Sequence, residues 1–370
     1  MDIRALRHVF GMDRASTKFD SFSKHHYDNA WHPLPAPTGT YPFHLDFEDV
    51  LGREAADRVA AAGKLVFHTV GDTGNLPYGA EAQDSVAFHM EEQMKANEPD
   101  RPAFFYHLGD VVYYNGERGK YEAQFYEPYF HYTAPIVAIA GNHDGAVLPN
   151  GDPSLQGFVE NFCASQPKHT WMAGNSNRTT MIQPNVYWTF KTPLATFIGL
   201  YSNVTGQLDK GTRVQEEWLA AELTAAKKDK CVIVAVHHPP YSLDDTHGGH
   251  VAIQESLDRA FDASGRTPSV VLTAHVHNYQ HFERKLGEAR VPYLVIGAGG
   301  YAGYSRLHQL KSHKSPAPGV TLKGDNTKLP GFMRVTITKT EFLGEYFVVP
   351  PPPGHLSGVA TLVDTVSVKL

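Results

Sequence analysis

Short runs of apolar residues alternate along this chain with longer stretches in which polar and apolar residues are mixed. The apolar runs predict short, buried strands at residues 65–70, 103–107, 136–140, 231–236 and 270–273. The mixed stretches predict helices near residues 80–96, 214–227 and 253–263. Short buried strands that alternate with helices are typical of βαβ units, and from residue 291 onwards the pattern predicts mostly strands. We therefore expect an α/β protein.

The same pattern predicts the domain organisation. A length of 370 residues suggests about two domains of ~150 residues each, although a single α/β domain can be longer. The repeated pattern begins near residue 64 and favours one domain over residues 63–370. Residues 1–62 are rich in histidine, proline and aromatic residues, and prolines interrupt residues 32–42. We expect this segment to be an N-terminal extension that wraps over the domain.

The composition excludes several classes of protein. Hydrophobic residues make up 42% of the chain and charged residues 19%, which excludes a disordered acidic segment and a coiled coil. The 33 basic and 39 acidic side chains give a net charge of −6 without a basic block, so we expect neither a nucleic acid nor a membrane as partner. No apolar run approaches the ~18 residues of a membrane helix.

Two further features leave alternatives open. No signal peptide is visible, which fits a cytoplasmic protein as written and a secreted or periplasmic one if the chain is a trimmed mature form. The 2 cysteines, Cys163 and Cys231, are too few for a disulfide framework, and the sequence leaves open whether they pair.

The candidate chemistry lies where the five expected strands end. Each of these ends carries carboxylate, amide, imidazole or phenol side chains, in the segments GDTG (71–74), GDVVY (109–113), GNHD (141–144), HHPPY (237–241) and AHVH (274–277). Any one of them alone is more often an ordinary turn, because glycine allows positive φ and aspartate caps helices. Ligand sites of α/β sheets gather at the carboxyl ends of strands, so the five together indicate one shared site.

The residue types indicate a site for two metal ions. Carboxylate and imidazole ligands favour iron, zinc or manganese, and these segments offer no thiolate. Two ions roughly 3.5–4 Å apart can clamp the attacking and leaving oxygens of a phosphoryl group. Such a pair needs a bridging carboxylate, and Asp110, after the second strand, is the candidate.

These segments resemble the signature of the purple acid phosphatases, which belong to the calcineurin-like metallophosphoesterases. That signature is GDxG, GDxxY, GNH(D/E), VxxH and GHxH, and this chain matches it in order, with VAVH at 234–237. Ala274 replaces one glycine, which supplies no ligand. The resemblance covers roughly residues 64–350, and the separate N-terminal β-domain of the family is absent. It implies a four-layer αββα sandwich, with two mixed sheets flanked by helices.

Carried over by position, the resemblance implies two sets of ligands. The first ion would be ferric iron, held by Asp72, Tyr113 and His277. The second would be iron, zinc or manganese, held by Asn142, His237 and His275, with Asp110 bridging the two ions. His143 matches a substrate-facing histidine that stabilises the phosphate or protonates the leaving group. His247 resembles a second one, and His250 competes for that role.

One position departs from the wider superfamily. Calcineurin-type relatives carry Asp-x-His in the first segment, and here Gly74 stands in place of that histidine. The family spacing selects Tyr113, rather than the neighbouring Tyr114, to fill the gap as a phenolate. A free phenol has a pKa near 10, so its ionisation at neutral pH favours ferric iron over zinc.

The implied function is hydrolysis of phosphate monoesters of small molecules by metal-bound hydroxide, as in acid phosphatases. One alternative is a metallo-phosphodiesterase that acts on cyclic nucleotides or phospholipid headgroups, because the motifs position metals and say little about the pocket. Another is an inactive scaffold with the same fold. The presence of all seven ligand positions and of His143 argues against this alternative.

A further motif, GAGGYA at residues 297–302, follows an expected strand and fits a dinucleotide-binding fingerprint. That fingerprint requires a helix next and an acidic residue about 20 positions on, whereas a polar, proline-bearing stretch follows here. We expect a tight turn beside the metal-binding segments instead.

Overall fold

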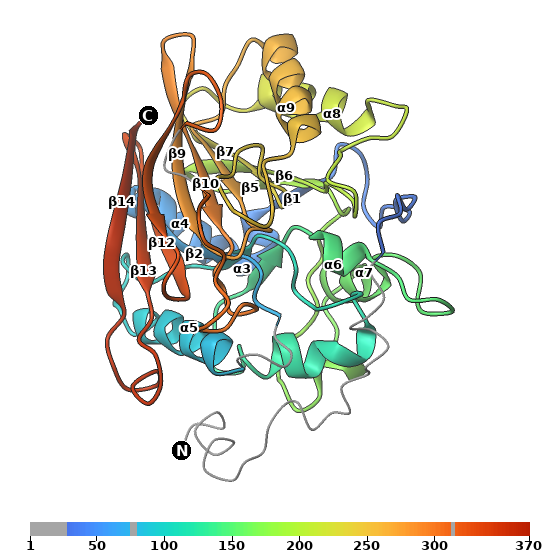
Figure 1. The fold of residues 1–370 in the computed structure, drawn as a ribbon, viewed down its shortest axis with the longest axis vertical. Coiled ribbons are helices and arrows are strands. Elements are labelled where there is room, and N and C mark those ends of the chain that lie inside the picture. The colour runs from blue at the N-terminus through green and yellow to red at the C-terminus, as the bar shows by residue number, and fades with distance from the viewer. Residues whose placement is uncertain (1–27, 75–79, 312–314) are drawn as a thin grey trace.

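The computed structural model describes residues 28–74, 80–311 and 315–370, and its strands form two sheets (Figure 1). The eight-stranded sheet has the order β1-β5-β6-β7-β8-β10-β9-β11. Its strands are β1 (His44–Asp46), β5 (Trp188–Lys191), β6 (Ala195–Leu200), β7 (Cys231–Val236), β8 (Val270–Thr273), β9 (Tyr279–Leu286), β10 (Ala289–Ile296) and β11 (Val320–Asn326). The six-stranded sheet has the order β14-β13-β12-β2-β3-β4. Its strands are β2 (Lys64–Val70), β3 (Phe105–His107), β4 (Ile136–Ala138), β12 (Gly331–Thr338), β13 (Glu341–Val348) and β14 (Thr361–Lys369).

Both sheets are mixed, and helices flank them. In the first, β6, β7, β8 and β10 are parallel, and in the second β2, β3 and β4 are parallel. The helices are α3 (Phe47–Leu51), α4 (Arg53–Ala62), α5 (Ala80–Gln93), α6 (Asn142–Gly145), α7 (Gln156–Phe162), α8 (Val214–Ala225) and α9 (Val251–Ser264). In Figure 1, α8 and α9 lie together at the top and α5 lies at the bottom. The prediction of two mixed sheets flanked by helices is confirmed.

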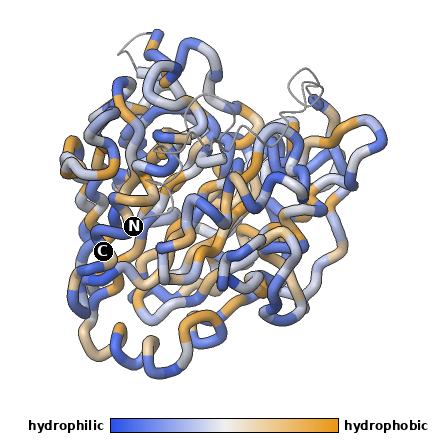
Figure 2. Tube along the Cα trace, turned by 90° about the horizontal axis from the view of Figure 1, so that it is seen from below, coloured by the Kyte–Doolittle hydropathy of each residue, from blue (hydrophilic) through white to orange (hydrophobic). Residues whose placement is uncertain are grey.

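Aromatic side chains fill the space between the sheets. The ring of Phe197 on β6 lies 5.1 Å from those of Phe67 on β2 and Tyr106 on β3. Tyr106 also stacks on Trp188 of β5, at 6.2 Å between ring centroids. These rings belong to one large buried cluster, and Figure 2 shows hydrophobic segments passing through the middle of the molecule. Their burial ties the sheets together, because large rings bury much apolar surface.

The structure agrees with the predicted strands and helices to within a few residues at their ends. The clearest case is β7, whose six residues are all buried, as expected for a central parallel strand with helices on its face. The pattern did not predict β1, β5, β6 or β9. The short strands β1 and β5 have 3 and 4 residues, too few for alternation to show in the sequence.

Part of the predicted N-terminal extension joins the eight-stranded sheet. Within residues 28–62, β1 pairs in parallel with β5, and α3 and α4 follow it. Residues 1–27 of the extension lie outside the described part of the chain. The boundary between residues 62 and 63 stays a prediction.

Two other findings concern the sequence as a whole. Cys163 and Cys231 are both buried and are free thiols. Within the described ranges, no helix is both long enough and apolar enough to span a lipid bilayer.

The carboxyl ends of the parallel strands of the two sheets meet at one edge of the sandwich. The backbone N–H of Gly71, just after β2, donates to the carbonyl oxygen of Ile296 at the end of β10, at 2.9 Å. The residue after β8, Ala274, donates in the same way to His237 after β7, at 2.9 Å. The segments that carry the predicted ligands therefore lie side by side where they leave the two sheets.

Candidate metal centre

The backbone is left-handed at three of the predicted ligands. Asp72, Asp110 and His275 have φ angles of 55°, 54° and 65°. Non-glycine residues rarely adopt such angles, and those that do cluster at functional sites. Gly109, before Asp110, has a φ of 95°, and a Cβ atom there would lie 2.7 Å from Nδ1 of His237. A glycine is therefore required for the second segment to approach this imidazole.

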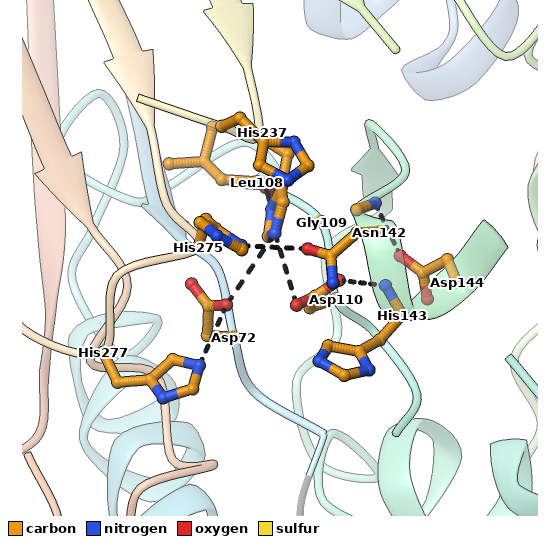
Figure 3. Close-up of polar contacts among 12 residues, drawn as sticks. Asp72, Leu108, Gly109, Asp110, Asn142, His143, Asp144, His237, His275 and His277 are labelled. Atoms are coloured by element: carbon orange, nitrogen blue, oxygen red, sulfur yellow. Dashed lines mark hydrogen bonds and ion pairs between the residues drawn. The ribbon is translucent and has the colours of Figure 1, made fainter. Parts of the chain in front are cut away.

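Asp72, Asp110 and His237 form the buried centre of the site (Figure 3). Nε2 of His237 lies 3.3 Å from Oδ2 of Asp110 and 4.0 Å from Oδ1 of Asp72. The opposite nitrogen, Nδ1, is bonded to the carbonyl oxygen of Leu108 at 2.8 Å, so Nε2 faces the carboxylates. The backbone N–H of His143 donates to Oδ1 of Asp110 at 2.9 Å, which turns Oδ2 towards His237.

Three atoms at this centre are buried without a hydrogen-bond partner among the described residues: Oδ2 of Asp72, Oδ2 of Asp110 and Nε2 of His237. A buried polar atom without a partner costs roughly 1–3 kcal/mol. Carboxylate oxygens and an imidazole nitrogen are also ligands that iron, zinc and manganese accept. The donor set therefore fits metal ions, which would satisfy all three atoms.

Tyr113 and His277 complete the first predicted set around Asp72. The Tyr113 hydroxyl donates to Oδ1 of Asp72 at 3.0 Å and lies 3.4 Å from Nε2 of His277. That Nε2 is 3.6 Å from the same carboxylate oxygen. A Cβ atom at Gly74 would lie only 3.0 Å from the Tyr113 ring, so the residue without a side chain leaves room for the phenol.

The second predicted set also converges. Nδ1 of His275 lies 2.9 Å from Oδ1 of Asn142, and the His275 and His237 rings are 5.3 Å apart. One ligand atom each from Asp110, His237 and His275 lies within 4.8 Å of the others. The structure thus brings together all seven predicted ligand positions, with Asp110 between the two sets.

The electrostatics of the buried groups also suit cations. Burial, together with neighbouring imidazoles, holds the pKa values of His275 and His277 well below 6.5, which leaves the neutral form that binds metals. Burial raises the pKa of Asp72 well above its usual range, an effect that His237 partly offsets and Asp110 reinforces. Burial lowers the pKa of His237, but the Asp110 carboxylate outweighs it and the net pKa is about 9. A bound cation would displace the protons that the raised pKa values of Asp72 and His237 favour.

Asp144 joins the second and third segments. Its Oδ2 accepts the backbone N–H of Gly141 at 2.8 Å, at the start of α6, and its Oδ1 accepts those of Val111 and Val112 at 3.0 and 3.2 Å. The buried carboxylate thereby holds together the loops that carry Asp110 and Asn142.

We expect Asp144→Ala to lower the free energy of unfolding of the metal-free protein by about 3–5 kcal/mol, since each buried donor left unpaired costs about 1–3 kcal/mol. Urea denaturation followed by circular dichroism measures this loss. Asp152→Ala, which removes a partly exposed ion pair with Arg118, serves as the control and should cost less than about 1 kcal/mol. Equal losses in the two variants would contradict the role given to Asp144.

His143 and His247 lie at the rim of the centre. Nδ1 of His143 is bonded to the carbonyl oxygen of Tyr114 at 2.7 Å, and its ring lies 4.4 Å from that of Tyr113. The His247 ring lies 4.7 Å from His275 and 6.0 Å from His277, between the two sets of ligands. His250 lies behind it, 4.4 Å from His238 and 5.4 Å from His275. The roles of all three in catalysis stay predictions.

Three groups near the centre were not predicted. His308 lies 4.6 Å from the His277 ring and is bonded through Nδ1 to Oδ2 of the buried Asp244, at 3.2 Å. The Tyr301 ring stacks on Tyr113 at 3.9 Å between centroids. His238, although adjacent to a predicted ligand, was given no role. In the sequence, only its position next to a predicted ligand could have indicated that His238 lies near the centre. No local sequence feature indicates that His308 does.

The GAGGYA segment forms the expected turn beside the metal-binding segments. Backbone N–H groups of Gly299 and Tyr301 donate to the carbonyl oxygens of Gly71 and Asp72, at 3.2 and 3.0 Å. The next described element is the strand β11. The turn therefore supports the first segment rather than opening a helix.

Comparisons with known proteins agree with this arrangement. Residues 66–279 match the family model described as calcineurin-like phosphoesterase. Tartrate-resistant acid phosphatase type 5 of Sus scrofa is 25% identical over 317 residues, which span 80% of this chain and 87% of that protein.

Two solved structures resemble the fold at low sequence identity. GAP50, described as the anchor in the inner membrane complex of Plasmodium, superimposes with a TM-score of 0.57 at 14% identity, over 83% of this chain and 89% of that one. PhoD superimposes with a TM-score of 0.50 at 16% identity, over 90% of this chain and 70% of that one. These likenesses concern the fold alone.

Proposed function

The chain belongs to the calcineurin-like phosphoesterase family, and we propose that it is a two-metal acid phosphatase that hydrolyses phosphate monoesters of small molecules. One observation carries the proposal most directly. Three buried ligand atoms, Oδ2 of Asp72, Oδ2 of Asp110 and Nε2 of His237, make no hydrogen bond among the described residues. The 25% identity to an acid phosphatase supports the monoester as substrate class.

In this proposal Asp72, Tyr113 and His277 would hold one ion, Asn142, His237 and His275 would hold the other, and Asp110 would be shared by both. Bound there, the two ions would supply positive charge for the phosphoryl oxygens and lower the pKa of a water molecule. The first ion would be iron, because its ligands include the Tyr113 phenol, and the second would be iron, zinc or manganese, because hard oxygens and imidazoles suit these metals.

His143 moves the proton to the leaving group. Its Nδ1–H donates to the carbonyl oxygen of Tyr114, so the ring is fixed and Nε2 is the atom that reaches the substrate. As the P–O bond breaks, the proton on Nε2 passes to the leaving oxygen, which departs as an alcohol. His247, whose ring lies 6.0 Å from that of His277, would donate to a phosphoryl oxygen and hold the substrate in line.

Tyr113 provides a spectroscopic test of the first ion. Burial, together with Asp110 and Asp72, raises the pKa of Tyr113 well above 10, so the phenol stays protonated until a strongly acidic cation binds. We expect the iron-loaded protein to show a tyrosinate-to-iron absorption band in the visible, lost in Tyr113→Phe and retained in Tyr114→Phe. A colourless iron-loaded protein, or a band that survives Tyr113→Phe, would contradict the assignment.

The monoester proposal is tested by comparing turnover of p-nitrophenyl phosphate and bis(p-nitrophenyl) phosphate by the metal-loaded full chain. The proposal expects the monoester to be hydrolysed faster in kcat/KM. A higher kcat/KM for the diester would establish the phosphodiesterase instead.

A further inference from the structure

Three imidazoles form a second candidate metal group beside the centre already described. His238, His250 and His275 each place one ring nitrogen within 4.8 Å of the others. The His238 ring lies 4.2 Å from His275 and 4.4 Å from His250, and the last two rings are 5.4 Å apart. Two of these residues, His238 and His250, belong to neither of the ligand sets described above.

The surroundings of two of the three rings indicate which nitrogen each one offers. Nδ1 of His238 is hydrogen-bonded to the buried Ser202 hydroxyl at 2.7 Å, and Nδ1 of His275 lies against Asn142 at 2.9 Å. Nδ1 of His250 faces Gly206, where a Cβ atom would approach it to 2.3 Å. Because Nδ1 of His238 and Nδ1 of His275 are engaged, Nε2 is the nitrogen that each of these two rings has left for a metal ion.

Rigid elements hold the three residues in place. His238 comes two positions after β7, and His275 two positions after β8. His250 is the residue that precedes α9, and its backbone N–H donates to the carbonyl oxygen of Pro239 at 2.8 Å. A metal-binding histidine usually donates the N–H of its other ring nitrogen to a supporting group. In this site Nδ1–H of His238 would donate to the hydroxyl oxygen of Ser202.

We propose that His238, His250 and His275 bind a third divalent transition-metal ion through one ring nitrogen each. Three imidazoles without a carboxylate suit zinc, copper or nickel rather than ferric iron. A three-histidine zinc site leaves a fourth position open. His250 is only partly buried, which gives the group access to solvent.

His275 is shared by the two groups, with Nδ1 towards Asn142 and Nε2 towards the third ion. With the second ion also bound, His275 would release its ring N–H proton to solvent and bridge the two ions as an imidazolate. The third ion would join the ends of β7 and β8 to the start of α9. It would thereby brace the loop between β7 and α9, which carries His247. The site does not depend on the proposed phosphatase activity.

Zinc alone tests the proposal. The full chain is stripped with a chelator, titrated with Zn²⁺, desalted, and its zinc content measured by mass spectrometry. We expect His250→Gln to bind one zinc per chain fewer than the wild type, and the exposed control His169→Gln to match the wild type. Equal zinc content in wild type and His250→Gln would overturn the proposal.

A second variant keeps all three ligands, in case His250→Gln does not fold. Ser202→Ala removes the hydroxyl that orients His238, and we expect it to weaken the last zinc to bind by about 10–100-fold. An unchanged affinity for that zinc in a folded Ser202→Ala protein would also overturn the proposal. A chain that binds the third zinc but hydrolyses no monoester would refute the phosphatase and leave this site standing. A chain that hydrolyses the monoester but binds no third zinc would refute this site and leave the phosphatase standing.

Discussion

Asp110→Asn is expected to cost the protein at least one metal ion and to slow phosphate ester hydrolysis by more than about 100-fold. Even a residue that only supports a metal ligand is typically worth about 10–100-fold in affinity or activity, and a bridging ligand is worth more. The amide keeps one oxygen to accept the His143 N–H but loses the negative charge that Oδ2 places 3.3 Å from His237. Loss of function should therefore occur in a folded protein.

Metal content per chain and turnover, measured on the same reloaded sample, check this prediction. Circular dichroism establishes that the variant is folded. Asp152→Asn, a carboxylate that only pairs with Arg118 at the surface, is the matched control and should behave as the wild type. Two ions per chain with near-normal turnover in Asp110→Asn would exclude the bridging role.

His143→Ala is expected to leave the metals bound and to slow the substrates with poor leaving groups most. The contact of His143 with Asp110 is made by its backbone, which the substitution keeps. General acid catalysis is typically worth ~10²–10⁴-fold, and leaving groups as acidic as p-nitrophenol need it least. We therefore expect a loss in that range for an alkyl phosphate and a much smaller loss for p-nitrophenyl phosphate.

The ratio of kcat values for the two substrates measures this effect. His169→Ala, which removes an exposed imidazole, should leave the ratio unchanged. If His143→Ala slowed both substrates equally, His143 would bind phosphate without donating a proton.

The positions of the metal ligands could be predicted because they follow directly from where buried strands end. Asp72 lies two residues after β2, Asp110 three after the short β3 and His275 two after β8. Parallel strands bring their carboxyl ends together irrespective of the loops that connect them. The central strand β7 could also be recognised, because all six of its residues are apolar.

Other parts of the site depend on contacts that local sequence does not encode. His308 reaches the centre because residues 244 and 310 pair across an isolated antiparallel bridge, far apart in the chain. The partner of His238 is Ser202, which lies 36 positions earlier. The strands β1 and β5 are too short to show a period and are defined by their pairing with each other.

The measurement that tests the central claim most directly is phosphate release from p-nitrophenyl phosphate by the full chain, before and after removal and return of metal. We predict no hydrolysis by the chelator-stripped protein. Hydrolysis should recover when iron is returned, either alone or together with zinc or manganese. Absence of hydrolysis with every one of these metals, in a protein that remains folded, would contradict the proposed phosphatase and favour an inactive scaffold.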